Sequence, residues 1–220
     1  MTDRILVIAA VPMELSGVRR DGGGQVRWVA AGMGRRAAAV VRGRLAEERF
    51  SLVVSTGFAG GVRPGFRVGD LVMASDVVDA ASGRRRRPTG GLSILQGACS
   101  VGTFVTVDGP LQDPERKAEI GSRWGAIAVD METAGVAEAA EAAGVPWFSL
   151  RVILDPMETR LAAGSARETL GLALRPARWG DLKSFLAAIQ RARQSLGNGL
   201  DVLIHAGNPL LQKPEASNVC

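Results

Sequence analysis

Two carboxylates follow buried strands in the middle of the chain. Glu132 comes just after the apolar run Gly125–Val129, where a strand leads into an alanine-rich helix over Met131–Ala143. Asp155 closes the next apolar strand, Val145–Leu154. In open α/β sheets, ligands collect beyond the carboxyl ends of the strands. A carboxylate at such a strand end is a better candidate for a functional group than one on a solvated helix face. The two acids therefore indicate acid–base chemistry on a bound ligand.

The histidine count narrows that chemistry. His205 is the only histidine among 220 residues, and Cys99 and Cys220 lie far apart in the sequence. Ser-His-Asp and Cys-His catalysis both need a histidine base, and His205 precedes a tail over 208–220 that we expect to be flexible. Neither a metal site nor a disulfide framework fits this composition. Any reaction must therefore run on carboxylates.

The charge balance points to anionic partners. The formal net charge is +5 and the sequence pI is about 10.2, which suits nucleic acid, an anionic membrane surface or an anionic substrate. Only 5% of the residues are aromatic, and no helix-turn-helix or RNP-like pattern occurs, so we expect no nucleic-acid partner. Arg84–Arg87, among Ser, Gly, Pro and Thr, predicts an exposed loop that is either solvated or bound to phosphate or a lipid headgroup.

The chain length, the N-terminal residues and the lengths of the apolar runs predict a single cytoplasmic domain. The N-terminus leads directly into a strand over Ile5–Val11 without the regions of a signal peptide, and no apolar run reaches about 18 residues. We expect one domain over 1–207, with 162–207 a basic helical C-terminal segment. Leu174–Leu196 interleaves Arg and Lys with Leu and aromatic residues, as either an interfacial helix on an anionic membrane or a helix packed on the core would.

Strands and helices alternate along the chain. Pro12 begins a helix, a second helix covers about Arg35–Glu48, and the glycine-rich Thr56–Gly61 forms a loop that either admits a ligand or makes a tight turn. Further strands are expected at Val26–Ala31, Leu52–Ser55, Val68–Ala74 and Val101–Val107. This alternation predicts an α/β fold with three layers, α/β/α, around a twisted, mostly parallel mixed sheet.

Five motifs in order resemble the purine nucleoside phosphorylase superfamily, and within it the methylthioadenosine/S-adenosylhomocysteine nucleosidase branch. They are Ala9–Glu14, Ala31–Gly34, Thr56–Gly61 with Val68–Asp70, Val129–Glu132 and Arg151–Asp155, and the resemblance covers residues 4–155. The basic, Leu-rich C-terminal segment is similar in composition to a narrower group, the hopanoid-associated phosphorylases, which act on adenosylhopane.

The resemblance implies cleavage of the N-ribosidic bond of an adenosyl compound, adenosylhopane or a similar adenosyl lipid, with release of adenine. The nucleophile is water or phosphate, and no cofactor is implied. We also expect a homo-oligomer and, with a lipid substrate, peripheral contact with an anionic inner membrane. Two alternatives are a soluble methylthioadenosine/S-adenosylhomocysteine nucleosidase and a non-catalytic nucleoside-binding protein.

The resemblance also implies roles for single residues. Asp155 is the expected acid at purine N7, and Glu14 is expected to orient the nucleophile, with Arg151 holding it or the nearby charges. Glu132 is expected to accept hydrogen bonds from the ribose hydroxyls, with Met131 packed under the sugar. N-ribosidic cleavage passes through an oxocarbenium-like sugar and needs such an acid and acceptors, and it does not require histidine.

The remaining expected binding residues form the walls of the site. They are Asp130, Phe58, Gly60, Pro110 and Leu111, with the purine pocket near Gly109–Leu111. The chain departs from the nucleosidase pattern at two of its positions, because Phe58 replaces a small polar residue and Leu154 replaces serine. Both changes make the site more apolar, which suits a greasy substituent on the ribose.

Overall fold

The computed structural model describes residues 4–18, 24–90, 97, 99–159 and 179–205. The predicted tail over 208–220 lies outside the described residues, as do residues 162–178 of the predicted helical C-terminal segment. The assignment of 1–207 to a single domain stays a prediction.

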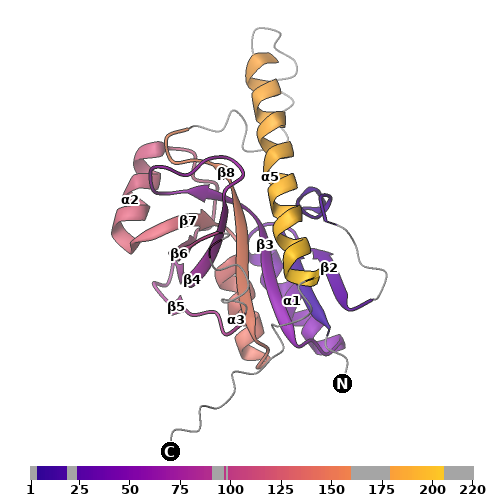
Figure 1. The fold of residues 1–220 in the computed structure, drawn as a ribbon. Coiled ribbons are helices and arrows are strands. Elements are labelled where there is room, and N and C mark those ends of the chain that lie inside the picture. The colour runs from indigo at the N-terminus through magenta and orange to yellow at the C-terminus, as the bar shows by residue number, and fades with distance from the viewer. Residues whose placement is uncertain (1–3, 19–23, 91–96, 98, 160–178, 206–220) are drawn as a thin grey trace, which may run out of the picture.

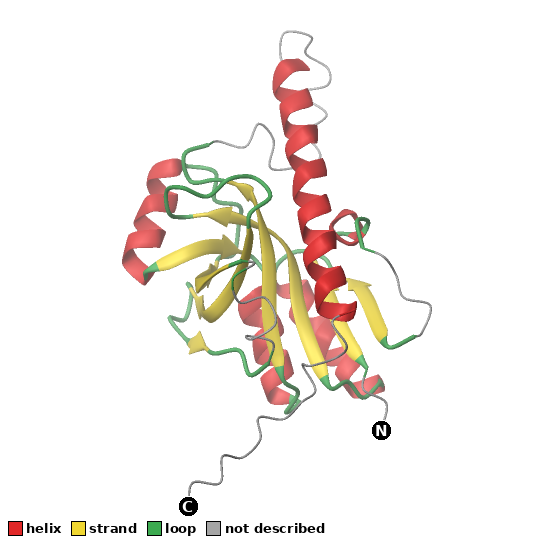
Figure 2. Cartoon of the chain, viewed as in Figure 1, coloured by secondary structure: helices red, strands yellow, loops and turns green. Residues whose placement is uncertain are grey.

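A mixed sheet of eight strands forms the middle of the molecule (Figures 1 and 2). Its strands are β1 (Ile5–Ala9), β2 (Val26–Ala30), β3 (Leu52–Gly61), β4 (Leu71–Asp79), β5 (Arg85–Arg86), β6 (Ser100–Thr106), β7 (Ala126–Asp130) and β8 (Trp147–Asp155). Among the described residues, five strand pairs are parallel and three are antiparallel. The expected mostly parallel mixed sheet is confirmed.

Five of the strands form a closed ring of strand pairings. β3 pairs with β8, β8 with β4, β4 with β6, β6 with β7, and β7 returns to β3 through Gly60 and Gly61. The prediction that Thr56–Gly61 is a loop was therefore wrong, since β3 runs through it. The reason is that β8 continues beside this segment as far as Asp155 and satisfies its backbone groups.

Helices cover both faces of the sheet. α1 (Arg35–Glu47) and α3 (Thr133–Ala142) bury Val41 and Val136 against one face, and α5 (Trp179–His205) buries Leu196 and Leu200 against the other. Strand β1 is buried on both sides, with Leu6 and Ile8 facing the first pair of helices and Ile5 and Val7 facing α5. The three-layer α/β/α expectation is confirmed.

Two elements of the fold, one helix and one short strand, were not predicted from the sequence. α2 (Pro114–Trp124) has ordinary start and stop signals, because Asp113 accepts a hydrogen bond from the backbone N–H of Glu115 and Gly125 ends the helix in the left-handed conformation. Strand β5 was the second element missed.

The helix that was predicted to begin at Pro12 is only a short 3₁₀ helix, η1 (Pro12–Leu15).

The arginine run Arg84–Arg87 is not uniformly exposed. Arg86 is buried, and its guanidinium pairs with Glu138 at 2.9 Å and Glu141 at 3.1 Å on α3. The expectation of an exposed loop was wrong at this residue because β5 pairs with β4 and Arg86 reaches the acids of α3 from this strand. Arg84, Arg85 and Arg87 are exposed or form surface contacts.

The C-terminal half of α5 packs on the core. Residues on its inner face, Ile189, Ala192, Leu196, Leu200 and Leu203, are buried at helical spacing. Its first turns extend beyond the sheet (Figures 1 and 2), where Leu186 is 53% exposed. None of the helices in the described ranges is long and apolar enough to span a bilayer.

Candidate active site

A cavity of about 230 Å³ opens where the strand ends meet. Its walls come from η1, the ends of β3, β7 and β8, and the loop between β6 and α2. Nine of the ten predicted site residues line it: Glu14, Phe58, Gly60, Pro110, Leu111, Asp130, Met131, Glu132 and Asp155. The predicted purine wall, Gly109–Leu111, lies in the same cavity. The tenth residue, Arg151, lies beneath the cavity and does not line it.

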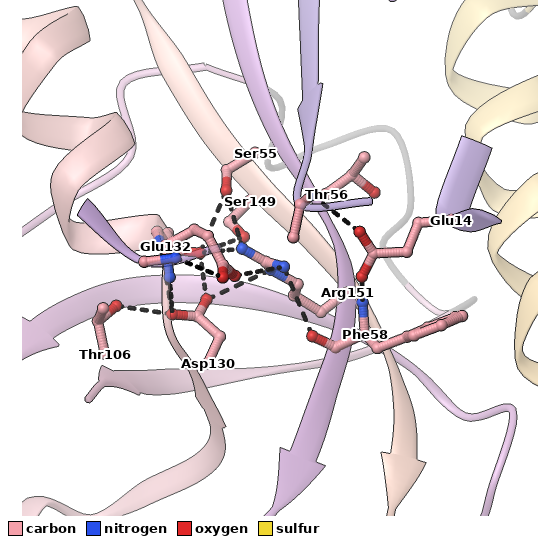
Figure 3. A network of polar contacts seen from close by, with 12 residues as sticks. Glu14, Ser55, Thr56, Phe58, Thr106, Asp130, Glu132, Ser149 and Arg151 are labelled. Atoms are coloured by element: carbon pink, nitrogen blue, oxygen red, sulfur yellow. Dashed lines mark hydrogen bonds and ion pairs between the residues drawn. The ribbon is translucent and has the colours of Figure 1, made fainter. Parts of the chain in front are cut away.

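Glu14 ties η1 to the sheet. Its Oε2 accepts the backbone N–H groups of Ala10 at 2.8 Å and Val11 at 2.9 Å, and its Oε1 accepts that of Phe58 at 2.8 Å (Figure 3). Burial raises the pKa of the Glu14 carboxyl above its usual range, while the charge of Arg151 and these N–H groups oppose the rise. The carboxylate is thus fixed in position and can accept a proton more readily than a solvated glutamate.

Arg151 is the central cation of the site. Its side chain is buried on β8, with Nε 3.3 Å from Asp130 Oδ2 and Nη1 3.4 Å from Glu132 Oε2 (Figure 3). Its Nη2 donates to Ser55 Oγ at 3.1 Å and Thr133 Oγ1 at 3.0 Å. Burial opposes its charge, but Asp130, Glu132 and Glu14 outweigh burial and raise the pKa of the guanidinium. Arg151 therefore stays charged.

Asp130 holds the other groups in place. Its Oδ1 accepts the Thr106 hydroxyl at 2.7 Å and the backbone N–H groups of Glu132 and Thr133 at 3.3 and 3.2 Å. Its Oδ2 accepts the Thr133 hydroxyl and pairs with Arg151. Both oxygens are occupied by the protein, so Asp130 orients its neighbours although it reaches the cavity wall.

Glu132 lies where β7 turns into α3, as the sequence predicted. Its Oε1 accepts the backbone N–H of Gly34 at 3.1 Å and its Oε2 faces Arg151. Burial and the charge of Asp130 raise the pKa of the Glu132 carboxyl, and Arg151 lowers it. Met131 lies beside it on the cavity wall.

Asp155 ends β8 at the opposite wall. Its Oδ2 lies 2.6 Å from Nζ of Lys117 on α2, and the Thr159 hydroxyl lies 3.5 Å from its Oδ1. Burial raises the pKa of the Asp155 carboxyl, and the hydrogen bond and charge of Lys117 work in the opposite direction. An aspartate on a cavity wall whose pKa is raised by burial is suited to proton donation.

Sequence reasoning missed several residues of this site. Lys117 was missed because α2 itself was not predicted, and Ser55 and Thr133 carry no signal as single polar residues within apolar elements. Met33 lines the cavity and is 61% exposed at its rim. No group of three or more histidine, cysteine or acidic residues in the described parts of the chain could hold a metal ion.

Sequence and structure comparisons place this geometry among known proteins. The model of the Phosphorylase superfamily matches residues 14–177, well over half of the chain. The chain belongs to the phosphorylase superfamily. The expected purine nucleoside phosphorylase type of fold and family is thereby confirmed at the superfamily level.

One curated protein similar to this superfamily member is a nucleosidase. The 5'-methylthioadenosine/S-adenosylhomocysteine nucleosidase of Geobacillus thermodenitrificans is 28% identical over 134 residues, which are 49% of this chain and 56% of the relative. The chain therefore spans about half the length of the curated relative it matches.

Solved structures show the same fold. The 5'-methylthioadenosine/S-adenosylhomocysteine nucleosidase of Helicobacter pylori is similar with a TM-score of 0.70 at 18% identity, covering 92% of this chain and 98% of that one. The futalosine hydrolase of the same organism has a TM-score of 0.69 at 17% identity, covering 92% and 97%. At these identities the likeness shows the phosphorylase-type α/β fold alone.

Proposed function

We propose that this protein is an enzyme that cleaves the N-ribosidic bond of an adenosyl compound and releases adenine, with water as the nucleophile. The observation that carries the proposal is the placement of Glu14, Glu132 and Asp155, three buried carboxylates with different partners, around one cavity. Superfamily membership and the nucleosidase relatives support the same reaction.

Asp155 is the group that protonates the departing base. As the bond between C1' and N9 breaks, its electron pair moves to the purine, and N7 takes the proton of the Asp155 carboxyl. Burial, which raises the pKa of this carboxyl, increases the protonated fraction that can act. The loop Gly109–Leu111 lines the same cavity, and we assign it as the wall for the base.

Glu132 and Met131 serve the ribose. The carboxylate of Glu132 is fixed by Gly34 and Arg151, so it can accept hydrogen bonds from sugar hydroxyls without reorganising. A negative charge there also stabilises the positive charge that develops on the sugar. Met131 supplies an apolar surface beside it.

The charge around Arg151 favours water over phosphate. Asp130, Glu132 and Glu14 surround this single guanidinium, so an incoming phosphate would meet an excess of negative charge. Dry phosphate sites need arginine donors or a helix N-terminus. Arg35 has an 88% exposed side chain and lies 3.7 Å from Asp108, and Arg36 and Arg63 are exposed.

The apolar wall of the cavity favours a substrate with a hydrophobic substituent on the ribose. Phe58, Leu154, Val107 and Leu111 line the cavity, and Met33 stands at its rim. We therefore propose an adenosyl lipid of the adenosylhopane type as the substrate, which places the enzyme in hopanoid biosynthesis. The nucleosidase relative favours methylthioadenosine or S-adenosylhomocysteine as the second candidate.

A lipid substrate goes with a membrane surface. We propose that the first turns of α5 meet an anionic membrane, since Lys183 and Leu186 are both exposed there. Flotation with vesicles tests this: the protein should rise with anionic vesicles, and Leu186→Glu should weaken the binding. Equal recovery with neutral and anionic vesicles would contradict it.

We also propose that the protein is a cytoplasmic homo-oligomer. Light scattering tests the oligomeric state.

The experiment that tests the function compares substrates. The full chain is incubated with adenosylhopane, methylthioadenosine, S-adenosylhomocysteine and adenosine, and released adenine is measured by chromatography. We expect release with the highest kcat/KM on adenosylhopane, and release slower by about two to four orders of magnitude from the Asp155→Asn variant. A higher kcat/KM on methylthioadenosine would move the assignment to the second candidate. No release from any of the four, with binding retained, would leave a non-catalytic nucleoside binder.

A further inference from the structure

A buried lysine holds the carboxylate of Asp155. The side chain of Lys117 is fully buried, and its Nζ lies 2.6 Å from Asp155 Oδ2. The same ammonium donates to the backbone carbonyls of Pro156 at 3.1 Å and Thr159 at 3.0 Å. An ammonium has three donors, and all three are directed at the segment that ends β8.

The sequence of α2 brings Lys117 to this position. Gly121 lies one turn further along the same face of the helix, and a Cβ built there would come within 2.1 Å of the carbonyl oxygen of Val62. Only a glycine allows α2 to lie this close to the end of β3. Burying a lysine without a partner is strongly unfavourable. The ion pair with Asp155 is therefore what allows Lys117 to be buried at this position of α2.

We propose that Lys117 is a positioning residue that fixes both the orientation and the protonation of Asp155. The proposal rests on the proposed function, in which Asp155 is the acid for the leaving adenine. One carboxylate oxygen, Oδ2, is taken by Lys117 at 2.6 Å. The other, Oδ1, has a long contact of 3.5 Å with the Thr159 hydroxyl, so we assign Oδ1 as the oxygen that serves the base. No other charged side chain in the described parts of the chain forms an ion pair with Asp155.

The proton balance of the step shows what the ammonium does. The Asp155 carboxyl gives its proton to N7 of the purine while the electron pair of the broken bond moves to the base. The oxygen of the attacking water bonds to C1', and one of its protons passes to the Glu14 carboxylate. At Asp155 the step leaves a carboxylate, which the Lys117 ammonium stabilises as a full ion pair until a proton from solvent restores the acid. Lys117 thereby strengthens the acid, in opposition to burial, which weakens it.

The other charged groups near the cavity are bound elsewhere. Glu132 and Asp130 face Arg151, and Glu14 accepts three backbone N–H groups. Glu158, near the end of β8, accepts the backbone N–H of Gly65 at 3.3 Å. Lys117 is therefore the charge that sets the behaviour of Asp155.

The test removes the charge and follows Asp155 directly. The carboxyl carbons of aspartate are labelled with ¹³C, the Asp155 signal is assigned by its loss in Asp155→Asn, and its titration is recorded in the wild-type protein and in Lys117→Met. We expect the pKa of Asp155 to rise by about one to three pH units in Lys117→Met. Lys117→Arg should restore most of the wild-type value, and Arg116→Met, which removes an exposed cation from the same helix, should change nothing.

Kinetics give the second readout. The limb of the kcat/KM profile against pH that is missing from Asp155→Asn should move to higher pH in Lys117→Met and stay in place in Arg116→Met. An unmoved Asp155 titration in folded Lys117→Met, or activity lost equally at every pH, would overturn the proposal. If Lys117→Met does not fold, Lys117→Gln serves in the same titration. If the wild-type protein releases no adenine, the proposed function fails, but the ¹³C titration still decides the role of Lys117.

Discussion

The carboxylate of Glu14 and the guanidinium of Arg151 lie side by side over the Cα of Gly57. A Cβ built on Gly57 would come within 2.5 Å of Glu14 Oε1 and 2.8 Å of Arg151 Nη1, and φ of this residue is +133°. Both the conformation and the space exclude any side chain. The glycine in the middle of β3 is thus what lets the candidate nucleophile-orienting acid reach the central cation.

This contact predicts a sharp effect of one methyl group. Gly57→Ala should displace Glu14 or Arg151 and lower kcat/KM at least tenfold, with a loss of stability of about 1–3 kcal/mol from backbone strain. Gly43→Ala is the matched control, because Gly43 lies in α1 with nothing within 4 Å of an added Cβ. It should leave activity unchanged and raise stability slightly. Equal activity of both variants would contradict the account.

Substitution of the candidate acid should separate chemistry from binding. Asp155→Asn removes the proton that the leaving purine receives and keeps the size of the side chain, so kcat should fall by about two to four orders of magnitude while KM changes little. Steady-state kinetics on the best substrate measure both. Turnover like that of the wild-type protein would remove Asp155 from the mechanism.

The sequence predicted most of the residues that line this cavity, because strand ends are visible as apolar runs that stop at polar residues. Glu132 and Asp155 were found in this way, and the resemblance supplied Glu14 and Arg151. The glycine-rich segment was misread as a loop because glycines usually interrupt strands. Here they permit the close approach of Glu14 and Arg151, and a single sequence cannot show which side chains will pack above a strand.

The pH dependence of the reaction should carry the signature of Glu14. Burial raises the pKa of its carboxyl above the ordinary value of 4.5, and the nucleophile-orienting role requires the ionised form. Activity should therefore fall as the pH drops through this raised pKa. Glu14→Gln should lower kcat by about two to four orders of magnitude, and its residual activity should lack that limb. A Glu14→Gln profile with the wild-type limb would assign the limb to another group.

Lys117 shows what the sequence alone could not supply. The start and stop signals at Asp113 and Gly125 could have revealed α2, and Lys117 would then have stood among the apolar residues Ile120 and Trp124 on one helix face. Its partner, however, is about 40 positions away in the chain. The pairing depends on how closely α2 packs on β3, which is a tertiary property.

The apolar wall predicts substrate preference. Phe58→Ser should lower kcat/KM for adenosylhopane by about 10–200-fold, the range for lost apolar contacts in a binding pocket. The same variant should change kcat/KM for adenosine little, since adenosine has no greasy substituent. Parallel progress curves with the two substrates measure the ratio. An equal loss on both would place Phe58 against the base or the ribose instead.

The most direct test of the central claim is the fate of the sugar in ¹⁸O-labelled water. The wild-type protein is incubated with its best adenosyl substrate in phosphate-free buffer, and the products are analysed by mass spectrometry. The account predicts adenine and a free sugar that carries one ¹⁸O from water at C1, corrected for exchange by a control with unlabelled sugar. Adenine that forms only when phosphate is added, together with a sugar phosphate, would contradict the hydrolytic mechanism.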